Sequence, residues 1–143
     1  MRCGPVSGRM RLLRSGSPWP RIQSGVACAT LDEARAEIAV TFAGESGELW
    51  LAASPVVRSD DVLVAVVLTV RRANWEGAPA DRYIIEAFTA ADQRRGPARS
   101  AMTAALAALS AAGERQVALT VTAENAPALA LYQAMGFADA EGA

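Results

Sequence analysis

Residues 125–137 read NAPALALYQAMGF, and the interpretation of the whole chain starts from this stretch. Its apolar residues recur at helical spacing after Pro127. Gly136 is expected to end the helix in a left-handed turn, and Phe137 to fold back onto the core. The stretch therefore predicts a short C-terminal helix whose apolar positions are Leu129, Leu131, Tyr132 and Met135.

The elements before this helix alternate between strand and helix. Residues 116–122 form an apolar, β-branched run that predicts a strand. Ahead of it, residues 92–98 open an alanine-rich helix in which Pro97 suits the first turn, and Gly113 ends that helix. One face of the helix is expected to carry Met102, Ala105, Leu106, Leu109 and Ala112.

Three further strands are predicted upstream. Residues 49–57 and 62–70 are separated by the polar turn 58–61, which indicates an antiparallel hairpin. A loop over 74–81 leads to a third strand over 83–89. The core order is therefore β-β-β-α-β-α. A helix crossing between the third and fourth strands makes those two strands parallel.

The beginning of the chain has a different character. Residues 1–29 hold five arginines and no acid, and their glycines and prolines break any periodicity. We expect an unstructured basic leader there and a folded domain over 30–143. That domain is predicted to start with a short amphipathic helix, capped by Thr30 and reaching Phe42 before Gly44.

Composition removes several classes of function. The chain has no histidine, so a Ser-His-Asp triad, a Cys-His pair and His-ligated zinc are excluded. Cys3 and Cys28 lack the spacing of a metal site, and no metal is expected. The apolar runs are strand-sized, far below the roughly 20 residues of a membrane span. We expect a soluble cytoplasmic protein that does not associate with membranes.

A candidate anion site lies where the third strand leads into the first long helix. Residues 93–98 read QRRGPA, and the first amides of a helix have no helical partners and lie at the positive end of its dipole. Arg94, Arg95 and Arg99 add charge suited to phosphates. Arginines at helix starts are also common on solvated surfaces, so this feature alone leaves both interpretations open.

Two motifs together resemble the GNAT acetyltransferase superfamily. Gln93-x-x-Gly96-x-Ala98 is similar to its Q/R-x-x-G-x-G/A pyrophosphate loop. Residues 125–137 are similar to its N-x-x-A-x-x-L-Y-x-x-x-G-F segment. The resemblance covers residues 49–137 and is to bacterial members from GC-rich genomes. It implies a mixed α/β sheet with the GNAT-like acyl-CoA N-acyltransferase fold and acetyl-CoA as co-substrate.

The resemblance also implies a site. In the family the third and fourth strands separate, and acetyl-CoA lies in the V-shaped gap between them. Asn125 would hold the pantetheine arm, and Tyr132, seven residues on and so on the same side of the helix, would protonate the departing thiolate. The other cofactor-binding positions would be Phe88, Thr89 and Ala90 for pantetheine, and Arg94, Arg95, Gly96, Ala98 and Arg99 for the pyrophosphate.

The reaction implied is direct acyl transfer to a primary amine of a small molecule or protein, with backbone N–H groups stabilising the oxyanion. Without histidine, the base that deprotonates the amine is Glu86, Glu76 or a water chain. Glu86 is the candidate we favour, although a strand carboxylate also commonly faces solvent or pairs with arginine. We expect Trp50 and Trp75 to serve packing.

Three departures from the family pattern are visible. Pro97 has no N–H to offer a phosphate. No first strand is recognisable before the hairpin, and the chain ends six residues after Phe137, without the family's terminal strand pair. We therefore expect an unpaired edge on the last strand, and either a fragmentary product or a domain completed by a second copy of itself as a homodimer.

Two other functions stay open on the sequence. A non-catalytic acyl-CoA-binding or interaction domain, or an inactive fragment, would keep the cofactor motifs and lose the acceptor side. A nucleic-acid-binding protein would use the arginine-rich residues 1–29, but the rest of the chain is acidic, which disfavours it.

Overall fold

The computed structural model describes the backbone of residues 7–13, 36, 39–74, 76, 78, 80–89, 95–122 and 125–139. Side chains are described for the same residues except 7–13, 62, 88, 89, 95 and 122.

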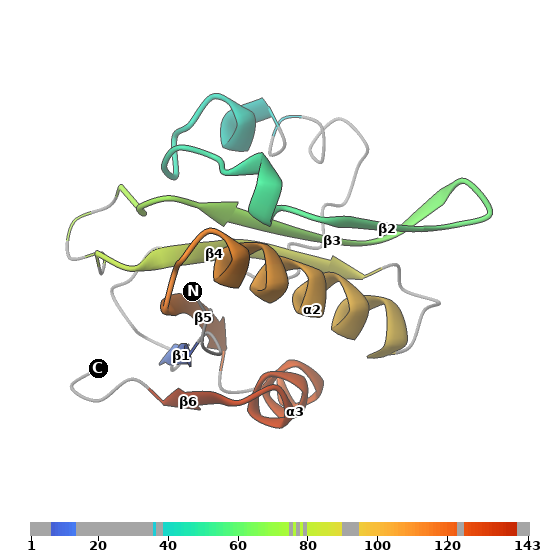
Figure 1. Cartoon of the computed structure of the whole chain (residues 1–143). Coiled ribbons are helices and arrows are strands. Elements are labelled where there is room, and N and C mark those ends of the chain that lie inside the picture. The colour runs from blue at the N-terminus through green and yellow to red at the C-terminus, as the bar shows by residue number, and fades with distance from the viewer. Residues whose placement is uncertain are drawn as a thin grey trace.

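The fold is a mixed α/β sheet with two helices packed against it (Figure 1). The strand order is β2-β3-β4-β5-β1-β6. The predicted fold class is confirmed, including a parallel β4 and β5 joined through a helix. The strands are β1 (Ser7–Leu13), β2 (Val56–Ser59), β3 (Val62–Val70), β4 (Arg82–Thr89), β5 (Gln116–Thr122) and β6 (Phe137–Asp139), and the helices are α2 (Arg95–Ala111) and α3 (Ala126–Ala134).

Both helices cover the same face of the sheet. Figure 1 shows α2 lying across the strands, and the buried residues of this face form one cluster with contributions from both helices. A second, smaller cluster lies on the opposite face. We call these the helix face and the open face. The helix face is built from Val67, Ile84, Met102, Leu109, Leu119, Val121, Tyr132 and Phe137 among others, and the open face from Leu68, Val70, Ala73, Tyr83, Ile85 and Ala118. No described helix is long and apolar enough to cross a membrane.

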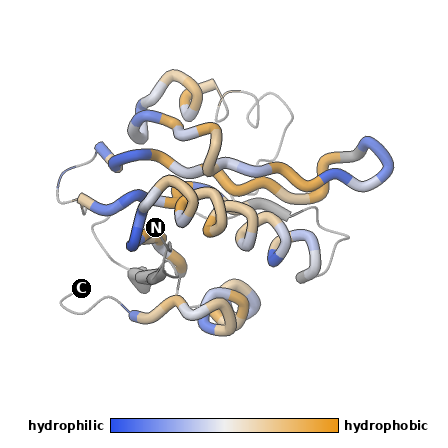
Figure 2. The backbone as a smooth tube through the Cα atoms, in the orientation of Figure 1, coloured by the Kyte–Doolittle hydropathy of each residue, from blue (hydrophilic) through white to orange (hydrophobic). Residues whose placement is uncertain are grey.

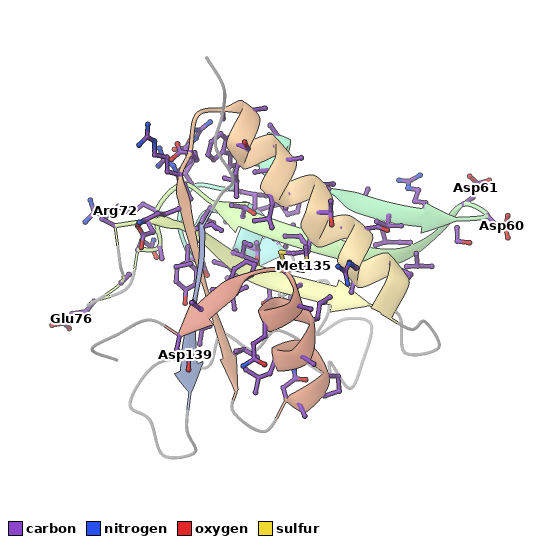
Figure 3. All side chains as sticks on the ribbon, turned by 60° about the horizontal axis from the view of Figure 1, so that its bottom comes forward. Asp60, Asp61, Arg72, Glu76, Met135 and Asp139 are labelled. Atoms are coloured by element: carbon purple, nitrogen blue, oxygen red, sulfur yellow. The ribbon has the colours of Figure 1, made fainter. Side chains whose placement is uncertain are left out.

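The β2–β3 hairpin turns at two consecutive aspartates. Asp60 and Asp61 have φ values of 50° and 66°, the left-handed pair that matches the twist of a two-residue hairpin. They lie at the far tip of the hairpin, where Figure 2 shows a hydrophilic end on an otherwise hydrophobic β3 (Figure 3). The turn was expected over 58–61, but Arg58 and Ser59 belong to β2.

The strand predicted over 49–57 is largely wrong. Leu49 makes only a single bridge to Val70, and residues 51–53 form a 3-10 turn, η1 (Leu51–Ala53). The Ser54 hydroxyl explains the difference, because its Oγ accepts a hydrogen bond from the Thr69 N–H at 3.0 Å. The Ser54 side chain thus takes the place of a backbone carbonyl as the acceptor for β3. The backbone of this segment can therefore turn before β2 starts at Val56.

The expectation for the start of the chain is also corrected. Ser7–Leu13, within the segment expected to be unstructured, forms β1 and pairs in parallel with all seven residues of β5. On its other side β1 pairs with β6. The edge of β5 is therefore covered by the chain's own N-terminal strand, and the expected unpaired edge does not occur. This pairing is non-local, so no local pattern in residues 1–29 announces it.

The helix predicted to reach Phe42 is described only at residues 36 and 39–42, which are helical. Phe42, at the end of this helix, has 59% of its surface exposed, and Thr41 beside it is buried. Downstream, the expected helix ends are confirmed. Gly113 and Gly136 take φ values of 86° and 91°, and Phe137 is buried in the helix-face cluster.

Gly47 makes the tightest backbone approach among the described glycines. Its φ is 128°, and a Cβ there would lie 2.2 Å from the carbonyl oxygen of Arg72. We expect Gly47→Ala to lower the free energy of unfolding by about 2–4 kcal/mol, because both the conformation and the contact forbid a side chain. Denaturant unfolding measures this.

Gly113→Ala is the matched control for that experiment. Gly113 has a left-handed φ of 86°, but a Cβ there meets no atom within 4 Å. Gly113→Ala should therefore lower the free energy of unfolding by only about 1–2 kcal/mol, because it pays for the left-handed conformation but for no steric contact. Equal losses in the two variants would contradict the steric argument for Gly47.

Candidate functional site

The central feature of the site is a gap between β4 and β5. The two strands pair only at their beginnings, from Arg82 opposite Val117 to Ile84 opposite Leu119. Beyond this point β4 stays paired with β3 as far as Thr89, and β5 stays paired with β1 as far as Thr122. The sheet therefore splits into two halves, as the resemblance implied. Within the described chain, β4 residues 85–89 have no partner in β5.

A β-bulge occurs where the strands separate. Leu68 and Thr69 on β3 lie opposite Glu86 and Ile84, so Ile85 is the extra residue on β4. A bulge increases local twist, which carries the second half of β4 away from β5. It also reverses the alternation of side chains. Glu86 lies across from Leu68, a residue of the open face, whereas Ile84 packs in the helix face.

The first turn of α2 lies at the open end of the gap, next to the end of β4 (Figure 1). Gly96 is exposed, and a Cβ there would meet no atom within 4 Å, so there is open space at this position among the described residues. Ala98 is half-buried and Arg99 is exposed. Of the other expected cofactor residues, Ala90 and Arg94 lie outside the described residues. Only the backbone is described for Phe88, Thr89 and Arg95.

Asn125 and Tyr132 occupy the beginning and the last turns of α3. Asn125 is the N-cap, and its Oδ1 accepts a hydrogen bond from the N–H of Ala128 at 3.3 Å. Because a cap lies outside the helix, the seven-residue helical spacing does not by itself align the two side chains. Tyr132 is only 3% exposed and packs against Phe137, with 5.6 Å between the ring centroids.

The two candidate proton-transfer residues therefore belong to opposite faces of the sheet. Tyr132 is part of the helix-face cluster, and Glu86 lies on the open face with its Oε2 buried. The gap between β4 and β5 lies between these two faces.

The remaining sequence candidates lie away from this gap. Figure 3 shows Glu76 projecting from the end of the molecule where Arg72 also lies, and it is exposed. Trp75 lies outside the described residues. Trp50 has a packing role, as expected, because the guanidinium of Arg71 stacks 4.2 Å from its ring centroid and that of Arg82 5.5 Å from it.

Sequence reasoning missed one polar pair at the gap. The hydroxyl of Tyr83 on β4 is hydrogen-bonded to Oγ1 of Thr120 on β5. Thr120 is one residue past Leu119, the last β5 residue that pairs with β4. Neither residue belongs to a motif, so no signal in the sequence alone marks the pair.

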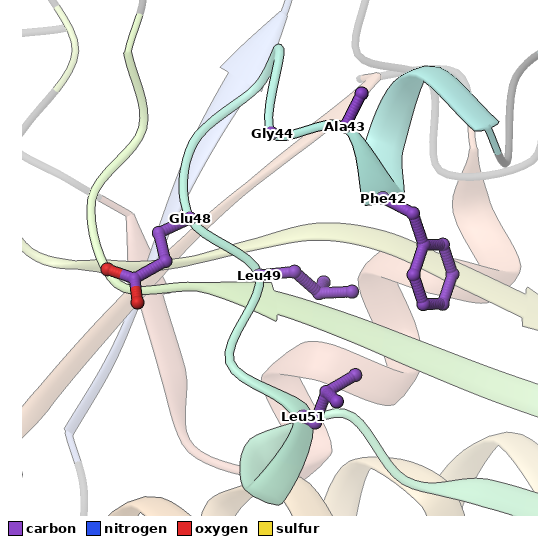
Figure 4. Close-up of a pocket in the computed structure, with 6 residues that line it drawn as sticks. All are labelled: Phe42, Ala43, Gly44, Glu48, Leu49 and Leu51. Carbon is purple, nitrogen blue, oxygen red and sulfur yellow. The ribbon is translucent and has the colours of Figure 1, made fainter.

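A separate open pocket of about 510 Å³ lies beside η1 (Figure 4). Leu49 lines it and also packs against the open-face cluster. Phe42 and Leu51 are the exposed apolar members of its wall, and Glu48 supplies a carboxylate. None of the site residues expected from the sequence lines this pocket.

The mixed sheet splits between two parallel strands, and a helix begins at the mouth of the split, the arrangement that the resemblance implied. The model of the Acetyltransferase (GNAT) family matches residues 19–137, and the chain belongs to this family. The match begins inside the segment that the sequence assigned to a leader. No curated protein and no solved structure matches the chain.

Proposed function

We propose that this protein transfers an acetyl group from acetyl-CoA directly to a primary amine of a small molecule or protein. The observation that carries the proposal is the early end of the β4–β5 ladder, which leaves one edge of residues 85–89 without a β5 partner. Backbone N–H and C=O groups on such an edge need partners. The amide groups of a pantetheine arm are of the right kind.

The described residues suit acetyl-CoA at the open end of the gap. The first amides of α2 have no helical acceptors, and they lie at the positive end of a 17-residue helix. Because Gly96 has no side chain and the space beside it is open, a pyrophosphate can lie close to the backbone there. Arg99 is exposed in the same turn, and we assign Arg94, Arg95 and Ala98 to the same phosphate site. Phe88, Thr89 and Ala90 would line the pantetheine path.

In the proposed mechanism, Glu86 accepts a proton from the incoming ammonium on the open face. The resulting amine nitrogen forms a bond to the acetyl carbon as the carbon–sulfur bond breaks. Backbone N–H groups of β4 at the bulge stabilise the oxyanion. Tyr132 donates its phenolic proton to the departing sulfur on the helix face, and the resulting phenolate regains a proton through water as the acylated nitrogen loses its second proton to give the neutral amide.

Asn125 has a narrower role in this proposal than the resemblance implied. Its Oδ1 already serves the N–H of Ala128. The amide Nδ2 is the atom it can offer to a carbonyl of the pantetheine arm. Asn125 would thus fix the start of α3 and one ligand contact with the same side chain.

The first test is a titration of the purified chain with acetyl-CoA, followed by thermal unfolding. A ligand at a hundred times its dissociation constant stabilises the fold by about 2.7 kcal/mol, so a clear rise in Tm is expected. Formation of acetylated product with a panel of primary amines then tests the transfer. Stabilisation without product from any amine would favour a non-catalytic acyl-CoA-binding domain. A cooperative transition with no shift would contradict the cofactor site.

A further inference from the structure

The hydrogen bond between Tyr83 and Thr120 joins the two halves of the sheet at the vertex of the gap. Tyr83 lies opposite Ala118, within the paired part of the strands, and Thr120 lies beyond the last pair. The bond therefore reaches from the closed part of the ladder to the first residue of β5 that has left β4. It connects the side chains of the two strands directly.

The bond joins a buried residue to a half-buried one, because Thr120 is partly exposed. Tyr83 is 2% exposed and belongs to the open-face cluster with Ile85 and Ala118. A polar group on a buried side chain is costly to leave without this partner, so the Tyr83 hydroxyl favours the position in which it meets Thr120. Together they fix where β5 diverges from β4.

The position of the vertex matters for the cofactor proposed above. The phosphates are assigned to the first turn of α2, at the open end of the gap beyond Thr89. The thioester at the other end of the ligand then points toward the closed end, where Ile85 and Glu86 bulge and where Tyr83 meets Thr120. A change in the width of the vertex acts on the acyl end of the ligand and leaves the phosphate end untouched.

We propose that Tyr83 and Thr120 are positioning residues that set the width of the gap at its acyl end. The inference rests on the proposed function. It differs from a purely structural role in what it predicts for two ligands. Loss of the bond should weaken acetyl-CoA, which reaches the vertex, and leave adenosine 3′,5′-bisphosphate unaffected, because that fragment carries only the phosphate end.

The test compares Tyr83→Phe, Thr120→Val and the double variant with the unmodified chain. Each single change removes one hydroxyl and leaves the other without this partner, so Tm should fall by about 4–8 °C. The double variant leaves neither hydroxyl behind, and we expect it to regain most of that loss. The dissociation constant for acetyl-CoA should nevertheless rise about five- to tenfold in all three, a coupling of the size found between contacting residues.

Thr120→Ser keeps the hydroxyl and should bind acetyl-CoA as the unmodified chain does. An unchanged acetyl-CoA constant in the double variant would overturn the inference. Equal weakening of acetyl-CoA and adenosine 3′,5′-bisphosphate would also overturn it, because general damage to the fold would then account for the loss. Failure of the unmodified chain to bind acetyl-CoA at all would instead refute the proposed function, and the inference with it.

Discussion

Tyr132→Phe should lower the rate of acetyl transfer by about ten- to a thousandfold while leaving the dissociation constant of acetyl-CoA nearly unchanged. The reason is that the phenol acts only when the carbon–sulfur bond breaks, so its removal affects the transition state and not the bound cofactor. The ring stays in the helix-face cluster against Phe137, which keeps the fold. Steady-state turnover and an acetyl-CoA titration on the same sample measure both quantities.

The leaving group provides a sharper readout of the same prediction. An aryl thioester of acetate releases a weakly basic thiolate that needs no proton, so the loss caused by Tyr132→Phe should shrink with that donor. The matched change on the open face is Glu86→Gln, which removes the proposed base. The fall in transfer rate caused by Glu86→Gln should be smaller when the acceptor is an amine of low pKa that is already neutral. It should not depend on which thioester is the donor. Unchanged turnover in either variant would remove that residue from its role.

Gly96→Glu should abolish detectable binding of acetyl-CoA. The substitution places a carboxylate in the first turn of α2, where the resemblance and the helix dipole both assign the pyrophosphate. Because a Cβ at Gly96 meets no atom within 4 Å, and its φ lies outside the left-handed region, the helix itself should tolerate the change. Calorimetric titration tests the loss of affinity, with circular dichroism as the check on folding.

Ala107→Glu is the control for added charge on the same helix. Ala107 is also exposed on α2, three turns further along and away from the mouth of the gap. It should bind acetyl-CoA with an affinity close to that of the unmodified chain. Retained affinity in Gly96→Glu would show that this turn is not the phosphate site. Equal losses in both variants would point to net charge instead of position.

Elements with a strong local signal were predicted well. The strands over 62–70 and 116–122 match β3 and β5 at both ends, because runs rich in β-branched and apolar residues strongly favour a strand. Glycine stops located the ends of both helices, since only a residue without a Cβ takes a left-handed φ at low cost. The proposed cofactor residues and Tyr132 came from the family resemblance, and Glu86 from the absence of histidine; their roles stay predictions.

Elements that depend on distant partners were not predicted. The run over 49–57 has strand character, yet the hydroxyl of Ser54 takes the Thr69 N–H and the chain turns instead. Residues 7–13 carry no clear pattern, and they become a strand because β5 and β6 offer them backbone partners on both sides. Non-local pairing of this kind cannot be seen in a short window of sequence.

The sequence by itself determined the type and order of the main elements, the family motifs, and the exclusion of histidine chemistry. Only the tertiary structure decided which side of the sheet each residue faces at the site. Strict alternation along β4 would put Glu86 on the helix face with Ile84, but the bulge at Ile85 turns it to the open face, across the sheet from Tyr132. A bulge forms between two strands, so neither strand's own sequence specifies it.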